Sequence, residues 1–300
     1  MTLQNKVVLV TGSISKGGIG EAIALLCLEQ GAKVMFHGLS WDEEHAKELV
    51  APYAGMGRAS YMVADLSDPQ NCKKLIAATI DSFGTLDCLV NNAATTQRCE
   101  FDKATPRTFD EIMAINAKAP FFLAQGAVRQ FKLNFELNQS GGRILNIGSV
   151  NDHGGEKVLI QYAMSKAALK AMTRNLADTV ELAQQGIYVN QLNLGWVSSG
   201  NEMRLKLAEG WPTGWQEKLP SQMAPSGKLL TPQQIAQHAL FWISGQAGPV
   251  NGSVVDVEQF PLIPRLNGGQ GHCHSRFFGE VSGTSGPLPK PQPPQIKANL

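Results

Sequence analysis

The stretch VVLVTGSISKGGIGEAIA, residues 7–24, predicts the fold by joining a buried strand to a helix through a glycine-rich turn. Val7–Val10 is apolar at every position, as expected for a central strand that is covered on both faces. Gly12, Gly18 and Gly20 follow it, and the helix after them would begin with unpartnered N–H groups that favour anions. The stretch therefore predicts a phosphate-binding turn, with more residues between Gly12 and Gly18 than a dinucleotide fingerprint usually has.

Short apolar runs and longer helical patterns alternate along the rest of the chain. Three helix starts place a capping side chain before a proline, at Asp68-Pro69, Thr105-Pro106 and Thr231-Pro232, and Gly31 and Gly186 follow helical stretches as expected for stops. The predicted strands are Val7–Val10, Lys33–His37, Ser60–Val63, Asp87–Asn91, Arg143–Ile147, Tyr188–Leu192 and Val254–Val257, with a helix over Ile19–Gln30. This alternation predicts an α/β fold, a single doubly wound Rossmann-type domain over residues 1–258 with a parallel sheet of about seven strands.

Composition limits the classes of partner. The formal net charge is +1, from 26 basic and 25 acidic residues, so we expect no nucleic acid and no membrane surface as a partner. The chain enters a strand almost at once and shows no signal peptide, and its five cysteines are odd in number and widely spaced. These features predict a cytoplasmic protein without a disulfide framework or a metal site.

The last residues, 259–300, form a Gly/Pro-rich extension that cannot continue the sheet. Its composition is typical of a solvated tail. The alternative is an arm that packs on the core or on a neighbouring subunit through Phe277 and Phe278. His272-Cys273-His274 is a weak candidate for metal binding.

Tyr162 and Lys166 are four residues apart in a strongly helical stretch, so their side chains project from one face. A phenol with a pKa of about 10 is a poor base near neutral pH. A neighbouring ammonium stabilises the phenolate, which makes the tyrosine a candidate general acid or base for an alcohol and carbonyl pair. The spacing alone is weak evidence, because such pairs are common on helix surfaces.

Further motifs accompany this pair in a fixed order. Ser149 ends the fifth predicted strand, Asn116 lies in the long helix opened by Thr105-Pro106, and LVNNAA and ADLSD end the fourth and third strands. With these motifs the sequence resembles the short-chain dehydrogenase/reductase family, in the branch with Tyr-x-x-x-Lys, over roughly residues 5–258. The enoyl reductase branch of that family also lengthens the glycine turn, but it spaces its tyrosine and lysine more widely.

The resemblance implies hydride transfer between a nicotinamide cofactor and a CH–OH group. Tyr162 would exchange a proton with the substrate oxygen, and Ser149 would hydrogen-bond that oxygen. Lys166 would bind the nicotinamide ribose and lower the pKa of Tyr162, and Asn116 would hold a water of the proton relay.

The resemblance also implies a set of cofactor contacts. Asp65 would meet the adenine, and Gly195–Ser199 would meet the nicotinamide carboxamide, with Leu194 and Ser199 in place of the family's proline and threonine. The full set is Gly12, Ser15, Lys16, Gly18, Ile19, Gly20, Leu39, Asp65, Leu66, Asn92, Ala93, Tyr162, Lys166, Gly195, Val197 and Ser199.

The cofactor preference is read at the end of the second strand. Family members that prefer NAD often carry an aspartate where this chain has Gly38, and those that prefer NADP often carry an arginine where it has Leu39. Lys16 is a point charge without the fork that grips a phosphate. These residues predict NAD(H) rather than NADP(H).

Members of the family commonly form dimers and tetramers, so the resemblance implies a homo-oligomer, a dimer or a tetramer.

The substrate is predicted from the polar segment VNDHGGEKVLIQ, residues 150–161. Asn151, His153, Gln161 and Trp196 are expected to contact it, and residues 201–228, with two tryptophans, are expected to form a lid. Hydrogen-bonding side chains select partner groups, so we predict a small, hydroxyl-rich substrate: a sugar, polyol or sugar acid. The alternatives are a 3-oxoacyl thioester reductase and a non-catalytic nucleotide-sensing protein.

Overall fold

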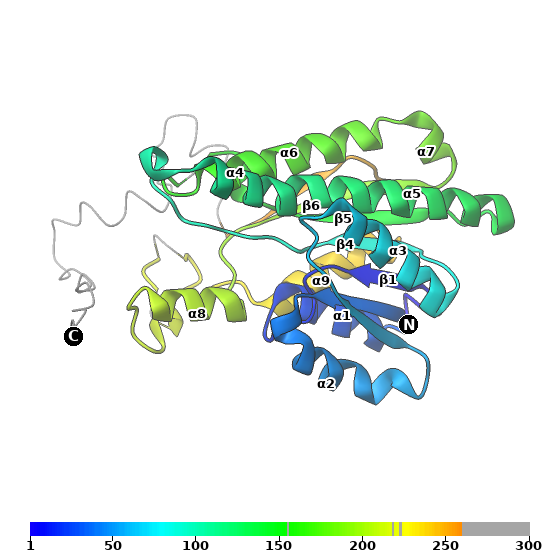
Figure 1. The fold of residues 1–300 in the computed structure, drawn as a ribbon, viewed down its shortest axis with the longest axis horizontal. Coiled ribbons are helices and arrows are strands. Elements are labelled where there is room, and N and C mark those ends of the chain that lie inside the picture. The colour runs from blue at the N-terminus through cyan, green and yellow to red at the C-terminus, as the bar shows by residue number, and fades with distance from the viewer. Residues whose placement is uncertain (155, 218, 222–223, 260–300) are drawn as a thin grey trace.

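The computed structural model describes residues 1–154, 156–217, 219–221 and 224–259 (Figure 1). The expectations for Phe277, Phe278 and His272-Cys273-His274 fall outside these residues. In the described part of the chain, no helix is both long enough and apolar enough to cross a membrane.

One parallel sheet of seven strands forms the centre, in the order β3-β2-β1-β4-β5-β6-β7. The strands are β1 (Val7–Val10), β2 (Lys33–Gly38), β3 (Ala59–Val63), β4 (Cys88–Asn91), β5 (Gly142–Ser149), β6 (Ile187–Leu194) and β7 (Val254–Val257). Every predicted strand is present, and the doubly wound fold class is confirmed. The strand order reverses between β1 and β4, which is where such sheets bind their ligands, at the carboxyl ends of the strands.

The helices follow the predicted capping signals. Asp68 accepts a hydrogen bond from the backbone of Gln70, while Thr105 and Thr231 form capping boxes. Gly31 and Gly186 have positive φ, as expected of left-handed stops. The α-helices are α1 (Ile19–Glu29), α2 (Glu43–Ala54), α3 (Pro69–Phe83), α4 (Pro106–Met113), α5 (Ala119–Asn138), α6 (Ile160–Ala177), α7 (Val180–Gln184), α8 (Gly200–Ala208) and α9 (Pro232–Ile243). Short 3₁₀ turns cover Ser40–Asp42, Phe101–Lys103, Val150–Asp152 and Trp215–Glu217.

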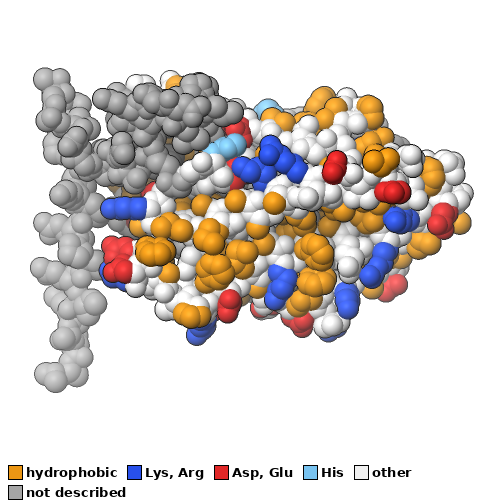
Figure 2. All heavy atoms as spheres, turned by 90° about the horizontal axis from the view of Figure 1, so that it is seen from above, with side chains coloured by type: hydrophobic (Ala, Val, Ile, Leu, Met, Phe, Trp, Pro, Cys, Tyr) orange, Lys and Arg blue, Asp and Glu red, His pale blue; other side chains and the backbone are white. Residues whose placement is uncertain are grey.

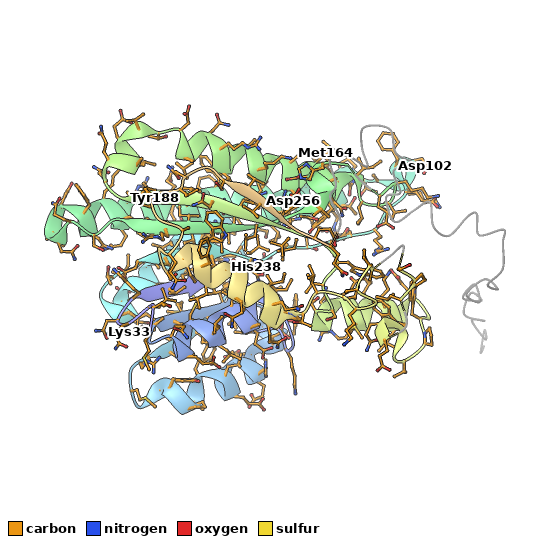
Figure 3. All side chains as sticks on the ribbon, turned by 180° about the vertical axis from the view of Figure 1, so that it is seen from behind. Lys33, Asp102, Met164, Tyr188, His238 and Asp256 are labelled. Carbon is orange, nitrogen blue, oxygen red and sulfur yellow. The ribbon has the colours of Figure 1, made fainter. Side chains whose placement is uncertain are left out.

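Two hydrophobic layers lie on opposite faces of the sheet. Alternate residues of β1 divide between them, with Val8 and Val10 on the face covered by α1 and α9, and Val7 and Leu9 on the face covered by α3 and α5. The view from behind shows α9, marked by His238, on the first of these faces (Figure 3). Burial on both faces explains why β1 reads as an uninterrupted apolar run.

The long helix expected to contain Asn116 is in fact three segments. α4 is followed by a π-helical turn, Ala114–Lys118, before α5 begins. Pro120 has no N–H group, so the carbonyl of Asn116 has no α-helical donor four residues further on. The wider π turn accommodates this missing bond, and such turns are frequent at functional sites.

β5 and β6 are longer than predicted because they pair with each other from Gly142 to Ser149. The two strands carry buried amides that join them to α6. Asn146 donates to Thr173 (2.8 Å), Thr173 donates to Gln191 (2.9 Å), and Gln191 donates to Asn193 (2.7 Å). Burial of satisfied amides breaks the apolar pattern by which a strand is recognised.

Candidate active site

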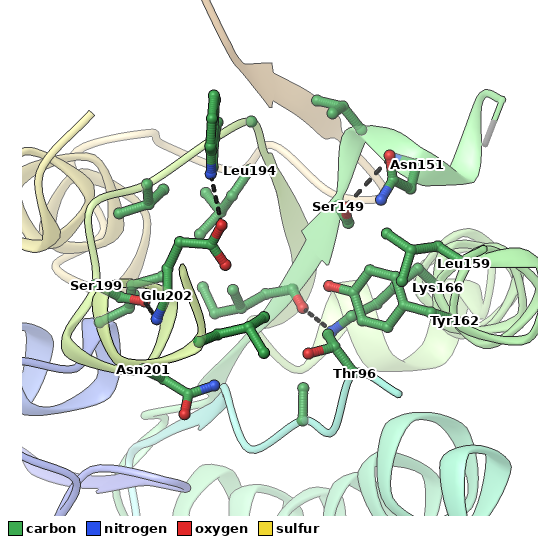
Figure 4. Close-up of a pocket in the computed structure, with 18 of the residues that line it drawn as sticks. Thr96, Ser149, Asn151, Leu159, Tyr162, Lys166, Leu194, Ser199, Asn201 and Glu202 are labelled. Atoms are coloured by element: carbon green, nitrogen blue, oxygen red, sulfur yellow. Dashed lines mark hydrogen bonds between the residues drawn. The ribbon is translucent and has the colours of Figure 1, made fainter. Parts of the chain in front are cut away.

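A cavity of about 280 Å³ opens at the carboxyl edge of the sheet (Figure 4). Five parts of the chain line it: the start of α1, the loop after β4, the segment from the end of β5 to the first turns of α6, the loop after β6, and α8 with the turn that follows it. The predicted site residues on its wall are Ile19, Asn92, Ser149, Asn151, Tyr162, Lys166, Gly195, Trp196, Val197 and Ser199. Residues far apart in the sequence therefore meet at one place.

Ser149, Tyr162 and Lys166 share one side of this cavity. Ser149 is the last residue of β5 and is 7% exposed, and its hydroxyl accepts from the backbone N–H of Asn151 (3.2 Å). One helical turn beyond Tyr162, the Nζ of Lys166 lies 5.6 Å from the centre of the phenol ring and donates to the carbonyl of Ile147 (2.8 Å). The strand thus fixes the hydroxyl and the helix fixes the phenol and the ammonium.

Burial dominates the protonation of this group. Burial and, to a smaller extent, the nearby charge of Glu202 raise the pKa of Tyr162 to about 12, against the lowering effect of the Ser149 hydroxyl. Burial also lowers the pKa of Lys166 to about 8. The direction at Tyr162 is opposite to the lowering that the sequence predicts, because loss of water outweighs any gain from the ammonium. Tyr162 is therefore protonated at neutral pH and placed to donate.

Asn116 lies behind this group and not on the cavity wall. Its side chain is 1% exposed, accepts from the backbone N–H of Thr95 (2.8 Å), and donates to the Thr95 carbonyl (2.9 Å) and to Ser165 (3.0 Å). The amide therefore ties the loop after β4 to α6. Its place in a proton relay stays a prediction.

The glycine-rich turn is held by side chains from two strands. Asn92, after β4, donates to the carbonyls of Thr11 (2.8 Å) and Gly12 (3.1 Å), while His37 on β2 accepts from the N–H of Gly12 (3.2 Å). Burial lowers the pKa of His37 to about 4, so the ring is neutral and its other nitrogen donates to Ala64. α1 begins directly after this turn, and its first residue lines the cavity.

The two additional residues of the turn change the end of β2. Ile14 is fully buried, and a Cβ atom at Gly38 would collide with the Ile14 side chain. The longer turn thus fills the space that an aspartate at position 38 would need. Leu39 follows in extended conformation outside the cavity.

The remaining expected cofactor residues border the same edge of the sheet without lining the cavity. Asp65 is exposed and accepts from the N–H of Ser67 (2.9 Å), whereas the Leu66 side chain is buried in the core and leaves only its backbone for a ligand. The others outside the cavity wall are Gly12, Ser15, Lys16, Gly18, Gly20, Leu39 and Ala93.

Comparison with known proteins gives a family for this geometry. A family model described as enoyl-(acyl carrier protein) reductase matches residues 12–259. The chain belongs to the short-chain dehydrogenase/reductase family. It is therefore related to oxidoreductases whose shared chemistry uses nicotinamide cofactors.

Individual relatives of this dehydrogenase/reductase differ in what they act on. An uncharacterized oxidoreductase of Thermotoga maritima is 35% identical over 86% of this chain and 98% of its own. A 2-dehydro-3-deoxy-D-gluconate 5-dehydrogenase of Dickeya dadantii is 30% identical over 85% and 95%. A 3-oxoacyl-[acyl-carrier-protein] reductase of Thermotoga maritima is 30% identical over 86% and 98%. A solved Serratia marcescens short-chain dehydrogenase/reductase, a double mutant, superposes with a TM-score of 0.72 at 25% identity over 86% and 98%.

Two of the four predicted substrate residues of this dehydrogenase/reductase lie outside the cavity wall, and their contact with a substrate stays a prediction. His153 turns toward β7, where its Nε2 lies 2.9 Å from Asp256 and 3.5 Å from the buried Asp152, which Lys170 also holds (2.9 Å). Gln161 is 9% exposed and packs toward Thr108 on α4. Asn151 and Trp196 do line the cavity.

The predicted lid contributes residues both to the cavity wall and to the packing behind that wall. Asn201, Glu202 and Trp211 line the cavity, whereas Trp215 is buried behind them. Trp215 stacks on Trp196 at 5.3 Å and meets Trp211 edge-on at 5.1 Å. One of the two predicted lid tryptophans thus faces the site and the other fixes the segment in place.

Sequence reasoning missed a charged cluster at the outer side of the cavity. Arg98 lies 3.6 Å from both Glu156 and Glu209, and Lys206, only 4% exposed, lies 2.7 Å from Glu209 and 4.0 Å from Glu202. The cluster joins the loop after β4 to α8 and its following turn. No spacing motif marks it, since its members come from three separate segments.

Proposed function

We propose that this protein is an NAD(P)-dependent dehydrogenase that interconverts an alcohol and a carbonyl on a polar, hydroxyl-rich substrate, a sugar, polyol or sugar acid. The observation that carries the proposal is the convergence of Ser149, Tyr162 and Lys166 on one side of a cavity whose opposite wall is polar and aromatic. A protein that only senses a nucleotide would need the fold but would not need these three side chains.

The residues present fit a dinucleotide cofactor. α1 begins after Gly18, which has no side chain to cap it, so first-turn N–H groups remain for a pyrophosphate. A Cβ at Gly12 would lie 2.9 Å from the backbone of Ala93, so only glycine lets the turn approach the loop after β4 this closely. Gly195–Ser199 would hold the nicotinamide end, and the bound cofactor supplies or accepts the hydride.

The chain's own residues would manage the proton. In the reducing direction Tyr162, protonated at neutral pH, donates its proton to the carbonyl oxygen, and Ser149 hydrogen-bonds the same oxygen as charge develops. Lys166 holds its ammonium beside the phenol and the carbonyl of Ile147. Asn116 would hold a water of the relay that returns a proton to Tyr162.

The cavity wall supports a hydroxyl-rich substrate. Asn151, Glu156 and Glu202 offer hydrogen bonds, and Trp196 and Trp211 offer aromatic surface. Two relatives bear on this choice in opposite directions, since one is a sugar-acid dehydrogenase by name and the other a 3-oxoacyl thioester reductase. Polar and charged side chains in the wall favour a hydroxyl-rich substrate over an acyl thioester, because an acyl chain needs an apolar cleft.

We propose NAD(H) as the preferred cofactor. Leu39 supplies no charge for a 2′-phosphate, and Gly38 is covered by Ile14. Lys16 is exposed in the turn, and Arg204 on α8 reaches Ser15 (3.3 Å) in the same turn. A higher kcat/KM with NADP(H), removed by Lys16→Ala or Arg204→Ala, would overturn this preference.

We propose that the enzyme is a cytoplasmic homo-oligomer, a dimer or a tetramer. The cysteines of the described residues are free, in support of a reducing compartment. Large apolar side chains are exposed on α5 and α6, among them Phe121 (51%), Leu137 (82%) and Met164 (49%). Figure 2 shows hydrophobic side chains gathered across this side of the molecule. Such a surface is typical of an interface.

The test is a substrate panel followed by the absorbance of reduced nicotinamide. Polyols, aldoses and sugar acids are offered with NAD⁺ and NADP⁺, and 3-oxoacyl thioesters with the reduced cofactors. Oxidation of at least one hydroxylated compound, with a kcat/KM above that for any thioester, is expected. Reduction of thioesters alone would support the runner-up, and no turnover with any compound would support a sensing role.

A further inference from the structure

Glu202 occupies a defined position in the cavity wall. It is the third residue of α8, where its backbone N–H donates to the Ser199 hydroxyl (3.3 Å) at the helix start. Its Oε1 accepts from the indole N–H of Trp196 (2.8 Å) and lies 4.0 Å from the ammonium of Lys206. These contacts hold the carboxylate in one orientation at 18% exposure.

The second carboxylate oxygen, Oε2, is left for a ligand. Among residues 1–154, 156–217, 219–221 and 224–259, no hydrogen bond reaches it. Figure 4 shows Glu202 across the cavity from Tyr162. Its charge also acts on the phenol, whose pKa it helps to raise. A substrate held by Tyr162 therefore presents its neighbouring atoms to this carboxylate.

The charges around Glu202 restrict which chemical group of a substrate can bind to it. Two cations, Arg98 and Lys206, face three carboxylates, those of Glu156, Glu202 and Glu209. A substrate carboxylate would meet an excess of negative charge, and a substrate ammonium would lie close to Lys206. A neutral hydroxyl avoids both repulsions and still donates a charge-assisted hydrogen bond.

We propose that Glu202 is a specificity-determining residue that accepts a hydrogen bond from a hydroxyl on the carbon next to the reacting one. The inference rests on the proposed function and narrows it to neutral vicinal diols and α-hydroxy carbonyls, and thus to sugars and polyols over sugar acids. Glu202 exchanges no proton: in the oxidising direction the hydroxyl proton of the reacting carbon would go to the phenolate form of Tyr162 and the hydride to the cofactor, while the neighbouring hydroxyl keeps its own proton.

The test uses two matched substrates, trans-1,2-cyclohexanediol and trans-2-methoxycyclohexanol. The methyl ether retains the oxygen but cannot donate. The wild-type enzyme is expected to prefer the diol by at least about tenfold in kcat/KM, since a site built to accept a hydrogen bond rejects an analogue without the donor. In Glu202→Gln the amide N–H can donate to the ether, so the preference is expected to shrink by at least about tenfold.

Glu209→Gln is the matched control. Glu209 pairs with the same Lys206 (2.7 Å) but does not line the cavity, so this variant tests general loosening of α8. Its diol-to-ether ratio is expected to stay within about threefold of wild type. Thermal unfolding of both variants verifies that each is folded.

Several results overturn the inference. Equal kcat/KM values for the diol and the ether in the wild-type enzyme would overturn it without any variant. An unchanged diol-to-ether ratio in Glu202→Gln, or an equal fall of that ratio in Glu209→Gln, would also overturn it. Better oxidation of a sugar acid than of the corresponding neutral sugar does so as well. Failure of the proposed function gives a different result: no alcohol is oxidised, and the protein either reduces thioesters alone or turns over no compound.

Discussion

Replacement of Lys166 by methionine is expected to stabilise the protein at neutral pH. The ammonium is 2% exposed, and burial lowers its pKa from 10.5 to about 8. At about 1.36 kcal/mol for each pKa unit, the charged form costs about 3 kcal/mol in the folded chain. Methionine removes this cost but leaves the Ile147 carbonyl without its donor, a loss of about 1 kcal/mol. Lys166→Met should therefore raise the free energy of unfolding by about 2 kcal/mol at pH 7.

The gain should disappear as the pH rises. The folded pKa of Lys166 lies below the unfolded one, so between pH 8 and 10.5 the unfolded wild-type chain binds more protons and stability increases with pH. By about pH 9.5 the wild-type protein should recover about 2 kcal/mol and match the variant. Urea unfolding of both proteins is measured without cofactor at pH 7 and pH 9.5, at one protein concentration. Equal destabilisation by Lys166→Met at both pH values would refute the reasoning.

Three further outcomes are expected. Gly38→Ala should lower the free energy of unfolding by about 2 kcal/mol, because its Cβ would collide with Ile14. Measured by urea unfolding in an Ile14→Ala background, the cost of Gly38→Ala should be at most about half as large, and an undiminished cost contradicts the contact. Asp152→Ala should cost about 3 kcal/mol in the same assay, since it leaves a partly buried ammonium unpaired, and a loss below about 1 kcal/mol would dismiss the salt bridge as a support of the turn after β5. Glu202→Gln should move the pH midpoint of alcohol oxidation downward, because the carboxylate raises the pKa of Tyr162; a midpoint that stays or rises would show that this charge does not reach the phenol.

Local signals made most of the fold predictable. Val7–Val10 is apolar throughout because both faces of the strand are covered, and Thr105 and Thr231 cap helices through contacts within four residues. The Tyr162 and Lys166 pair follows from helix geometry alone. Such features depend on neighbours in the sequence, which a single chain displays directly.

Features that depend on contacts between distant segments could not be predicted from the sequence. His153 looked like a substrate residue because it follows Ser149, yet its partner Asp256 is on the last strand. Ile14 fills the space above Gly38 only because the longer turn folds back onto β2. The break in the helix at Asn116 could have been predicted from Pro120. The rise in the pKa of Tyr162, where a lowering was predicted, depends on the burial of the phenol, which the sequence does not show.

Turnover by Tyr162→Phe tests the central claim most directly. The variant removes the transferable proton and little volume, so kcat for the best alcohol in the panel should fall by at least about 10²-fold. The dissociation constant of the cofactor, measured by nicotinamide fluorescence, should change by less than about threefold, because the phenol is one of many expected contacts. A kcat close to that of the wild-type enzyme would remove Tyr162 from the mechanism and contradict the proposed proton transfer.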